Sequence, residues 1–154
     1  MELAPLLTIH IQAEPPFSMG STPRGEVRVI RFRGGTFEGD GGVEGGVRGT
    51  VANGGVDWQH VRADGVLEIR AHYLLVTDQE ETVEVVSEGI RHAPVGVLDR
   101  IAAGEYIPAD QYYFRTAIRL TTSSARLDHF NRLIAVSSGE RTRDSVRIMV
   151  HAVR

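Results

Sequence analysis

The chain has 154 residues, of which 42% are hydrophobic and 24% charged, a composition typical of one soluble folded domain rather than of a disordered chain. It has no cysteine, and all 17 basic residues are arginine, which excludes thiolate and lysine chemistry, disulfides and cysteine-ligated metals. The net charge of −3, with arginines and acidic residues interspersed, argues against a nucleic-acid partner.

The first half of the chain is predicted to be largely extended. Residues 6–12 and 26–32 are rich in β-branched side chains, which favours strands. Ten of the 17 glycines fall within residues 34–55. A Gly-x-Gly-x-x-Gly phosphate-binding motif begins there but fails at Glu44. The glycines are therefore predicted to form bulges and tight turns in strongly bent strands, with residues 48–51 as a candidate strand.

The second half shows a period of two. Apolar side chains alternate with polar ones through residues 66–76, residues 82–91 are again extended, and the polar residues 78–81 between them predict a hairpin. Residues 112–120 and 145–153 alternate in the same way. On residues 112–120 the two faces differ, but the pattern alone does not decide which one points inward.

Helical spacing of apolar residues is confined to residues 94–103 and 124–134. Many short strands with little helix predict one all-β domain over residues 1–154, a sandwich or an antiparallel β-barrel with one or two short helices. Closure into a barrel would remove exposed strand edges. The first ten residues have no basic segment before an apolar run, and no apolar run nears the ~18 residues of a membrane span, so a cytoplasmic protein with no membrane partner is expected.

An ordered series of short motifs extends over nearly the whole chain. Its clearest members are Gly34-Gly35-Thr36-Phe37-Glu38-Gly39, Gly54-Gly55-Val56-Asp57-Trp58, Gly89-Ile90-Arg91-His92, Tyr112-Tyr113-Phe114-Arg115-Thr116 and Ser138-Gly139-Glu140-Arg141. The series resembles the uncharacterised family catalogued as domain of unknown function thirty-two thirty-seven. The resemblance implies a single-domain, calycin-like antiparallel β-barrel, and it implies no assigned activity.

Two carboxylates and two arginines are candidate catalytic groups. Glu38 and Asp57 each lie beside a large aromatic residue, and an apolar wall raises a carboxyl pKa toward neutrality, as acid/base catalysis requires. Arg91 and Arg115 lie in the most family-like segments and could clamp a carboxylate or enolate. The alternative is structural: Asp57 fixes a turn, and the arginines form internal pairs with Glu38, Asp57, Glu68 or Glu84.

Histidines could supply a proton shuttle near neutral pH, and His72, His92 and His129 are the candidates. The resemblance makes two of them unusual, because His129 stands where relatives carry a tryptophan and His72 interrupts an aspartate–x–arginine pattern before Tyr73. No two histidines have metal-ligand spacing, so no metal site is predicted. The candidate ligand-binding residues are Trp58, Tyr73, Tyr113 and His129, although structural packing also explains the aromatic ones.

The main hypothesis is a barrel cavity that binds a small organic molecule, with cofactor-free acid/base chemistry of the isomerase, dehydratase or cyclase type. The alternative is a non-catalytic binding or assembly module that acts as a homodimer. Whether the protein is an enzyme stays open between the two. The catalytic hypothesis requires at least three of five residues to line one solvent-connected cavity: Glu38, Asp57, His72, Arg91 and Arg115.

Overall fold

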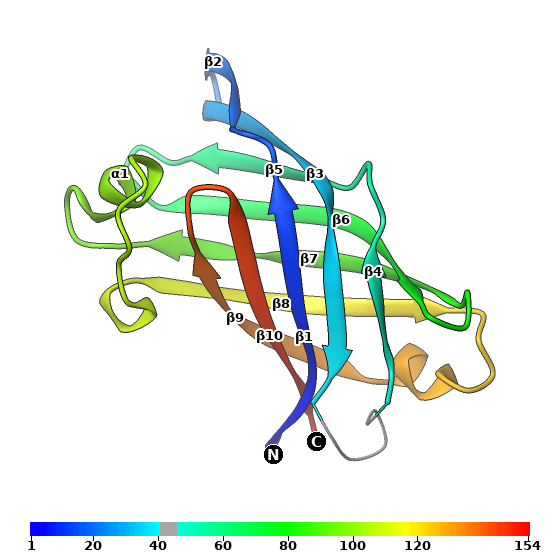
Figure 1. The fold of residues 1–154 in the computed structure, drawn as a ribbon. Coiled ribbons are helices and arrows are strands. Elements are labelled where there is room, and N and C mark those ends of the chain that lie inside the picture. Colours follow the sequence, from blue (N-terminus) through cyan, green and yellow to red (C-terminus); the bar gives the residue numbers. More distant parts are fainter. Residues whose placement is uncertain (41–45) are drawn as a thin grey trace.

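The structure, a computed structural model, describes residues 1–40 and 46–154 (Figure 1). The strands are β1 (Leu3–Ala13), β2 (Phe17–Thr22), β3 (Gly25–Gly39), β4 (Arg48–Val51), β5 (Val56–Val61), β6 (Leu67–Thr77), β7 (Thr82–His92), β8 (Tyr113–Thr122), β9 (Ile134–Arg141) and β10 (Ser145–Val153). The helical elements are α1 (Val97–Ala102) and two 3-10 turns, η2 (Ala109–Gln111) and η3 (Asp128–Arg132). None of the described helices is long and apolar enough to cross a membrane.

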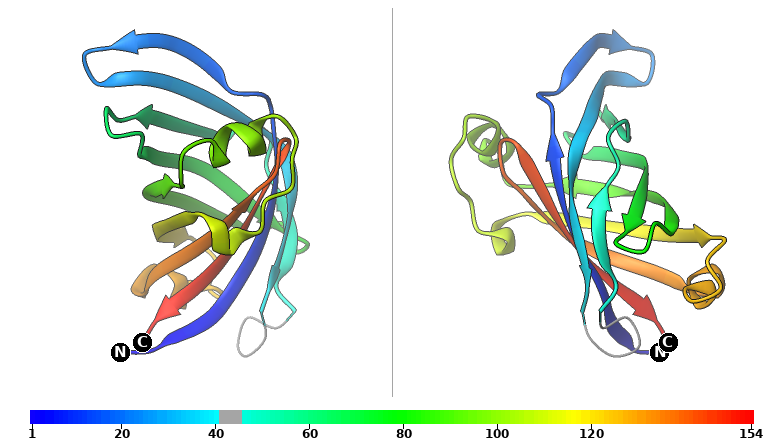
Figure 2. Two further views of the ribbon diagram at one scale, coloured as in Figure 1. Left: turned by 90° about the vertical axis from the view of Figure 1, so that its left-hand side faces the viewer. Right: turned by 45° about the vertical axis from the view of Figure 1, so that its right-hand side comes forward.

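All strand pairings are antiparallel, and they close the sheet into a barrel. The order is β1-β10-β9-β8-β7-β6-β4-β3-β2, β5 pairs with β3 and β6, and the additional pairing of β1 with β3 completes the closure. Figure 2 shows the β2–β3 hairpin extending beyond the barrel wall. The predicted all-β antiparallel barrel with short helices is therefore confirmed.

The long strand β3 changes partners along its length. Its first part pairs with β2 and β5, and its second part pairs with β1 and β4. Gly35 lies at this change with φ of 140°, and a Cβ there would lie 1.9 Å from the carbonyl oxygen of His10. Glycine is thus required where β1 and β3 meet. The prediction that glycines serve a bent strand holds at this position, whereas residues 41–45 of the glycine-rich segment lie outside the described residues.

Side chains alternate inward and outward, and the interior divides into two halves. We call one the closed half, because fully buried aliphatic side chains fill it: Leu7, Ile9, Leu75, Val83, Val85 and Ile118. Phe130 of η3 and the neighbouring Leu127 are also buried and cap this end. The other end, which we call the mouth half, lies on the side of α1 (Figure 1) and contains Asp57, Gln59, Arg91 and Arg141.

The expected strands and the hairpin turn at residues 78–81 are present. Residues 94–103 contain α1 as predicted, but residues 124–134 form only the 3-10 turn η3 before β9 begins. Strands β2, β5 and β9 were not predicted. β2 and β5 have six residues each, and β9 contains Ser137-Ser138-Gly139, so none of them shows the long β-branched alternation that marks a strand.

Candidate functional site

The mouth half contains a small chamber that adjoins a larger opening. The chamber has a volume of about 30 Å³, which is room for about one water-sized group. The opening has about 620 Å³ and lies between α1 and the β5–β6 and β9–β10 turns. Ile30, Gln59, Arg91 and Arg141 line both spaces. Arg91 and Arg141 are thus reached from solvent through the mouth, whereas Asp57 lines only the chamber.

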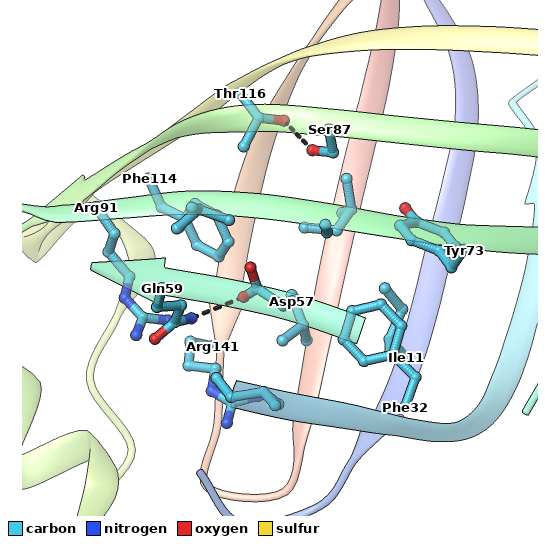
Figure 3. A pocket seen from close by; sticks show the side chains of 15 residues that line it. Ile11, Phe32, Asp57, Gln59, Tyr73, Ser87, Arg91, Phe114, Thr116 and Arg141 are labelled. Carbon is cyan, nitrogen blue, oxygen red and sulfur yellow. Dashed lines mark hydrogen bonds between the residues drawn. The ribbon is translucent and has the colours of Figure 1, made fainter. Parts of the chain in front are cut away.

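Asp57 points into the chamber from β5 and is 8% exposed (Figure 3). Its Oδ2 accepts a hydrogen bond from Nε2 of Gln59 at 2.7 Å, two residues along on the same strand face. Its Oδ1 is buried and has no hydrogen-bond partner among the described residues. Burial raises the pKa of the Asp57 carboxyl above its ordinary value, and the Gln59 hydrogen bond and the nearby guanidinium charges oppose that shift.

Arg91 enters the chamber from the end of β7 and is 8% exposed. Its guanidinium carbon lies 5.5 Å from the ring centroid of Phe114, a cation–π contact. Its Nε is buried without a hydrogen-bond partner in the described chain. Burial, followed by the charge of Arg141, lowers the pKa of Arg91 to about 10, so the group stays cationic at pH 7.

Arg141 enters from the end of β9 and is 9% exposed. Its backbone N–H donates to the hydroxyl of Tyr112 at 2.9 Å, and Nη2 donates to the carbonyl of Arg143 at 3.5 Å. Burial lowers the pKa of Arg141, while the charge of Asp57 acts in the opposite direction. Within the described residues, 1–40 and 46–154, no salt bridge within 4.0 Å joins Asp57 to Arg91 or Arg141. The site therefore brings one carboxylate and two cations together without an ion pair.

The chamber wall beyond these charges is neutral. Tyr73 is buried and packs edge-to-face on Phe32 with 5.3 Å between ring centroids. Burial raises the pKa of Tyr73, so its hydroxyl stays protonated at physiological pH. Ser87 donates to Thr116 at 2.8 Å, and Thr116 shares a hydrogen bond with Ser137 at 2.7 Å. These two hydrogen bonds give partners to the buried hydroxyl groups of three neighbouring strands, β7, β8 and β9.

Three of the nine predicted site residues line the chamber: Asp57, Arg91 and Tyr73. Of the five proposed catalytic residues only Asp57 and Arg91 do so, fewer than the three required, so that set of five does not form a site. Arg141, which was not among the five, is the third charged group of the chamber. Five others are exposed, point outward and do not line the chamber: Glu38, His72, Arg115, Trp58 and Tyr113. His129 lies in η3 against Phe130, at the closed end of the barrel.

The outward residues have surface partners. Glu38 lies 3.7 Å from His10, and His72 lies 2.9 Å from Glu84. Arg115 stacks on the ring of Tyr113 at 5.3 Å. Adjacent positions on a strand point to opposite faces, so Arg115 is outward because its neighbours Phe114 and Thr116 are inward.

Sequence reasoning missed Gln59 and Arg141. Gln59 could have been found, because a residue two positions after an inward Asp57 shares its strand face. Arg141 ends the family-like segment Ser138-Gly139-Glu140-Arg141, but β9 itself was not predicted. Within the described residues, no three His, Cys, Asp or Glu side chains come close enough together to hold a metal ion.

Comparisons with known proteins agree with the barrel. The profile of the family described as "Protein of unknown function (DUF3237)" matches residues 1–153. UPF0311 protein RPA1785 of Rhodopseudomonas palustris is 31% identical over 99% of this chain and 97% of its own length, and the TM-score to its crystal structure is 0.92.

Two further solved structures are similar. A β-barrel-like protein of Acinetobacter baumannii has a TM-score of 0.82 at 30% identity, covering 99% of this chain and 96% of its own. An enzyme from Penicillium herquei has a TM-score of 0.67 at 18% identity, covering 97% and 93%, and therefore shares the fold alone.

Proposed function

The chain belongs to the family of proteins of unknown function DUF3237, and from that premise we propose that it binds a small organic molecule at the barrel mouth. Asp57 is the acid/base group of this site, and Arg91 and Arg141 stabilise negative charge on a ligand oxygen. The reaction class that fits is cofactor-free proton transfer of the isomerase, dehydratase or cyclase type.

One observation carries this proposal: the only two buried side-chain atoms without a hydrogen-bond partner, among the residues that the structure describes, both lie in the chamber. They are Oδ1 of Asp57 and Nε of Arg91. Leaving a buried polar atom unpaired costs about 1–3 kcal/mol, and more when the group is charged. Such groups with shifted pKa values cluster at functional sites, where a ligand completes their hydrogen bonds.

The chemistry of Asp57 follows from its surroundings. A carboxyl group whose pKa is raised by burial can donate a proton at a pH where an exposed aspartate cannot, and can take one back afterwards. The guanidiniums stay charged and can stabilise an enolate or alkoxide as it forms. The fold neighbour from Penicillium herquei supports only the point that this barrel can house an enzyme.

A screen of small organic fragments by protein NMR tests the proposal. We expect binders to shift the signals of Gln59, Arg91 and Arg141 around the mouth. The Asp57→Asn variant should fold and bind the same fragments with altered affinity. Asp78→Asn is the matched control, because Asp78 lies in an exposed turn beside Arg48. A screen whose binders all lie away from the mouth, or one with no binders, would contradict the proposal.

A second candidate function is a non-catalytic module that assembles with a copy of itself. It is favoured by β2, whose described partner is β3 alone and which exposes Phe17 (60%) and Met19 (54%). A free strand edge with apolar side chains favours association. Light scattering tests this candidate: a dimer that becomes a monomer in the Phe17→Ser variant supports it, and a wild-type monomer contradicts it.

Two sequence-based expectations complete the proposal, a homodimer and a cytoplasmic location. Dimer formation does not conflict with ligand binding, because β2 lies outside the closed barrel wall (Figure 2). Cell fractionation tests the location, and recovery in the membrane or secreted fraction would contradict it.

A further inference from the structure

We propose that the ligand of this site is an organic anion with one ionised oxygen group, such as a carboxylate, held between Arg91 and Arg141. This inference rests on the proposed function and narrows it to a class of ligand. Figure 3 shows both guanidinium groups on the same side of Asp57, next to the amide of Gln59.

The charge balance of the chamber is positive. Two buried guanidiniums face one carboxylate, and burial favours the neutral form of that carboxylate. A buried charge without a partner is costly, because the interior solvates it poorly. A ligand with one negative charge would bring the balance to neutral when Asp57 is ionised.

Charged groups at the rim of the mouth do not provide this balance. Arg28 pairs with Glu26 at 2.9 Å and Asp64 pairs with Arg62 at 2.5 Å, so neither pair leaves a free negative charge at the rim. The remaining rim charges are exposed and screened by solvent: Asp99, Arg143 and Asp144. Asp144 acts on Arg141 from this exposed position, whereas the rim group that acts on Arg91 is Arg28, a like charge that does not balance it.

The two arginines also have N–H groups available to donate hydrogen bonds to a ligand. A guanidinium carries five N–H donors, and no hydrogen bond joins those of Arg91 to another described residue. The Phe114 ring supports the guanidinium plane of Arg91 on one side. Arg141 uses Nη2 in a single long bond to the Arg143 carbonyl. A carboxylate, with two acceptor oxygens, matches such free donors and forms charge-assisted hydrogen bonds with them.

The dimensions of the site set the shape of the ligand. The chamber of about 30 Å³ admits one small polar group, whereas the mouth of about 620 Å³ is in the range of small-molecule pockets. Apolar side chains of Val61, Leu98 and Ile101 help to line the mouth. The ligand therefore has a compact ionised head, which reaches the arginines, and an apolar body, which stays in the mouth.

Calorimetry with two matched probes tests the inference. 1-Naphthoate and 1-naphthamide share a ring system and a planar head group, but only naphthoate is charged at pH 7. At fixed ionic strength we expect naphthoate to bind about tenfold more tightly or more, because charge-assisted hydrogen bonds are roughly twice as strong as neutral ones. This comparison uses the wild-type protein and does not depend on any variant folding.

Single-residue variants then test which arginines recognise the carboxylate of naphthoate. Arg91→Met and Arg141→Met should each weaken naphthoate about tenfold and leave naphthamide unchanged, by loss of one charge-assisted hydrogen bond. Arg115→Met is the matched control, because Arg115 lies on the outer face of β8, and it should change neither affinity.

Each other outcome has a defined meaning. Equal affinities for the two probes would overturn the inference and leave the proposed function standing. A naphthoate preference that survives in both chamber variants would also overturn it, because the charge would be recognised elsewhere. Failure of both probes to bind more tightly than about 1 mM would overturn the inference and the proposed function together.

Discussion

The two halves of the barrel interior share strands β1, β6, β7 and β8, but the buried charged side chains of the described chain all lie in the mouth half. In the closed half, Leu7, Ile9 and Leu75 have no exposed surface. In the mouth half, the inward positions of the same sheet carry Asp57, Gln59, Arg91 and Arg141, and the two unpartnered buried atoms of the described chain lie there. Strand alternation thus sets which positions point inward, while the residues at those positions decide what each half does.

This difference separates stability from function. Aliphatic burial contributes about 25 cal/mol per Å² of apolar surface removed from water. Burying charged groups without close partners costs free energy instead. Aliphatic burial in the closed half therefore offsets the cost of the charged groups that the mouth half holds without close partners.

The largest effect is expected in the closed half. Phe130→Ala should lower the free energy of unfolding by about 3–5 kcal/mol, because the ring is fully buried and its removal leaves a cavity. Denaturant titration measures the loss. Affinity for an anionic probe at the mouth should not change if the variant is folded, and a large drop in that affinity would show that the two halves are not independent.

A smaller loss is expected where the two halves meet. A Cβ on Gly139 would lie 2.4 Å from the ring of Phe114, the same ring that supports Arg91. Gly139→Ala should therefore cost about 1–3 kcal/mol by overpacking and should weaken naphthoate by displacing Arg91. Adding Phe114→Leu should recover part of the stability. Unchanged stability and unchanged affinity would contradict the packing described for Arg91.

The hydroxyl of Tyr112 holds the backbone of Arg141 in place. Tyr112→Phe should cost about 1 kcal/mol, the net contribution of a typical hydrogen bond, because water from the mouth can reach Arg141. The affinities of the two probes test whether Tyr112 positions Arg141 for ligand binding. Naphthoate affinity should fall while naphthamide affinity stays constant, and an equal fall for both would indicate a general distortion of the mouth.

The alternation of side chains along the strands already groups several site residues by strand face. The period of two groups Arg115 with Arg119 on one face of β8, and His72 with Arg70 on one face of β6, and in the structure both of these faces point outward. Arg91 follows Val83 and Val85 at even spacing on β7, which marks an inward position.

Other features could not be predicted because they depend on contacts between distant strands. The inward face of β9 is Ala135, Ser137, Gly139 and Arg141, and it has too little apolar character to identify itself. Its Arg141 meets Asp57 only because the sheet closes between β1 and β3. A barrel interior combines residues by register and closure, which a single sequence does not encode locally.

The free energy of unfolding of Asp57→Asn, measured against wild type from pH 4 to pH 8, tests the central claim most directly. Because folding raises the pKa of Asp57, the native state favours its neutral form, and wild-type stability from this group falls as pH rises above the ordinary value of 3.8. Asparagine has no such penalty. The variant should match or exceed wild type at pH 7, with a difference that grows from pH 4 upward. A loss of roughly 3–5 kcal/mol at pH 7 would instead show that Asp57 forms a structural ion pair with the arginines, which would contradict a mouth half maintained for binding.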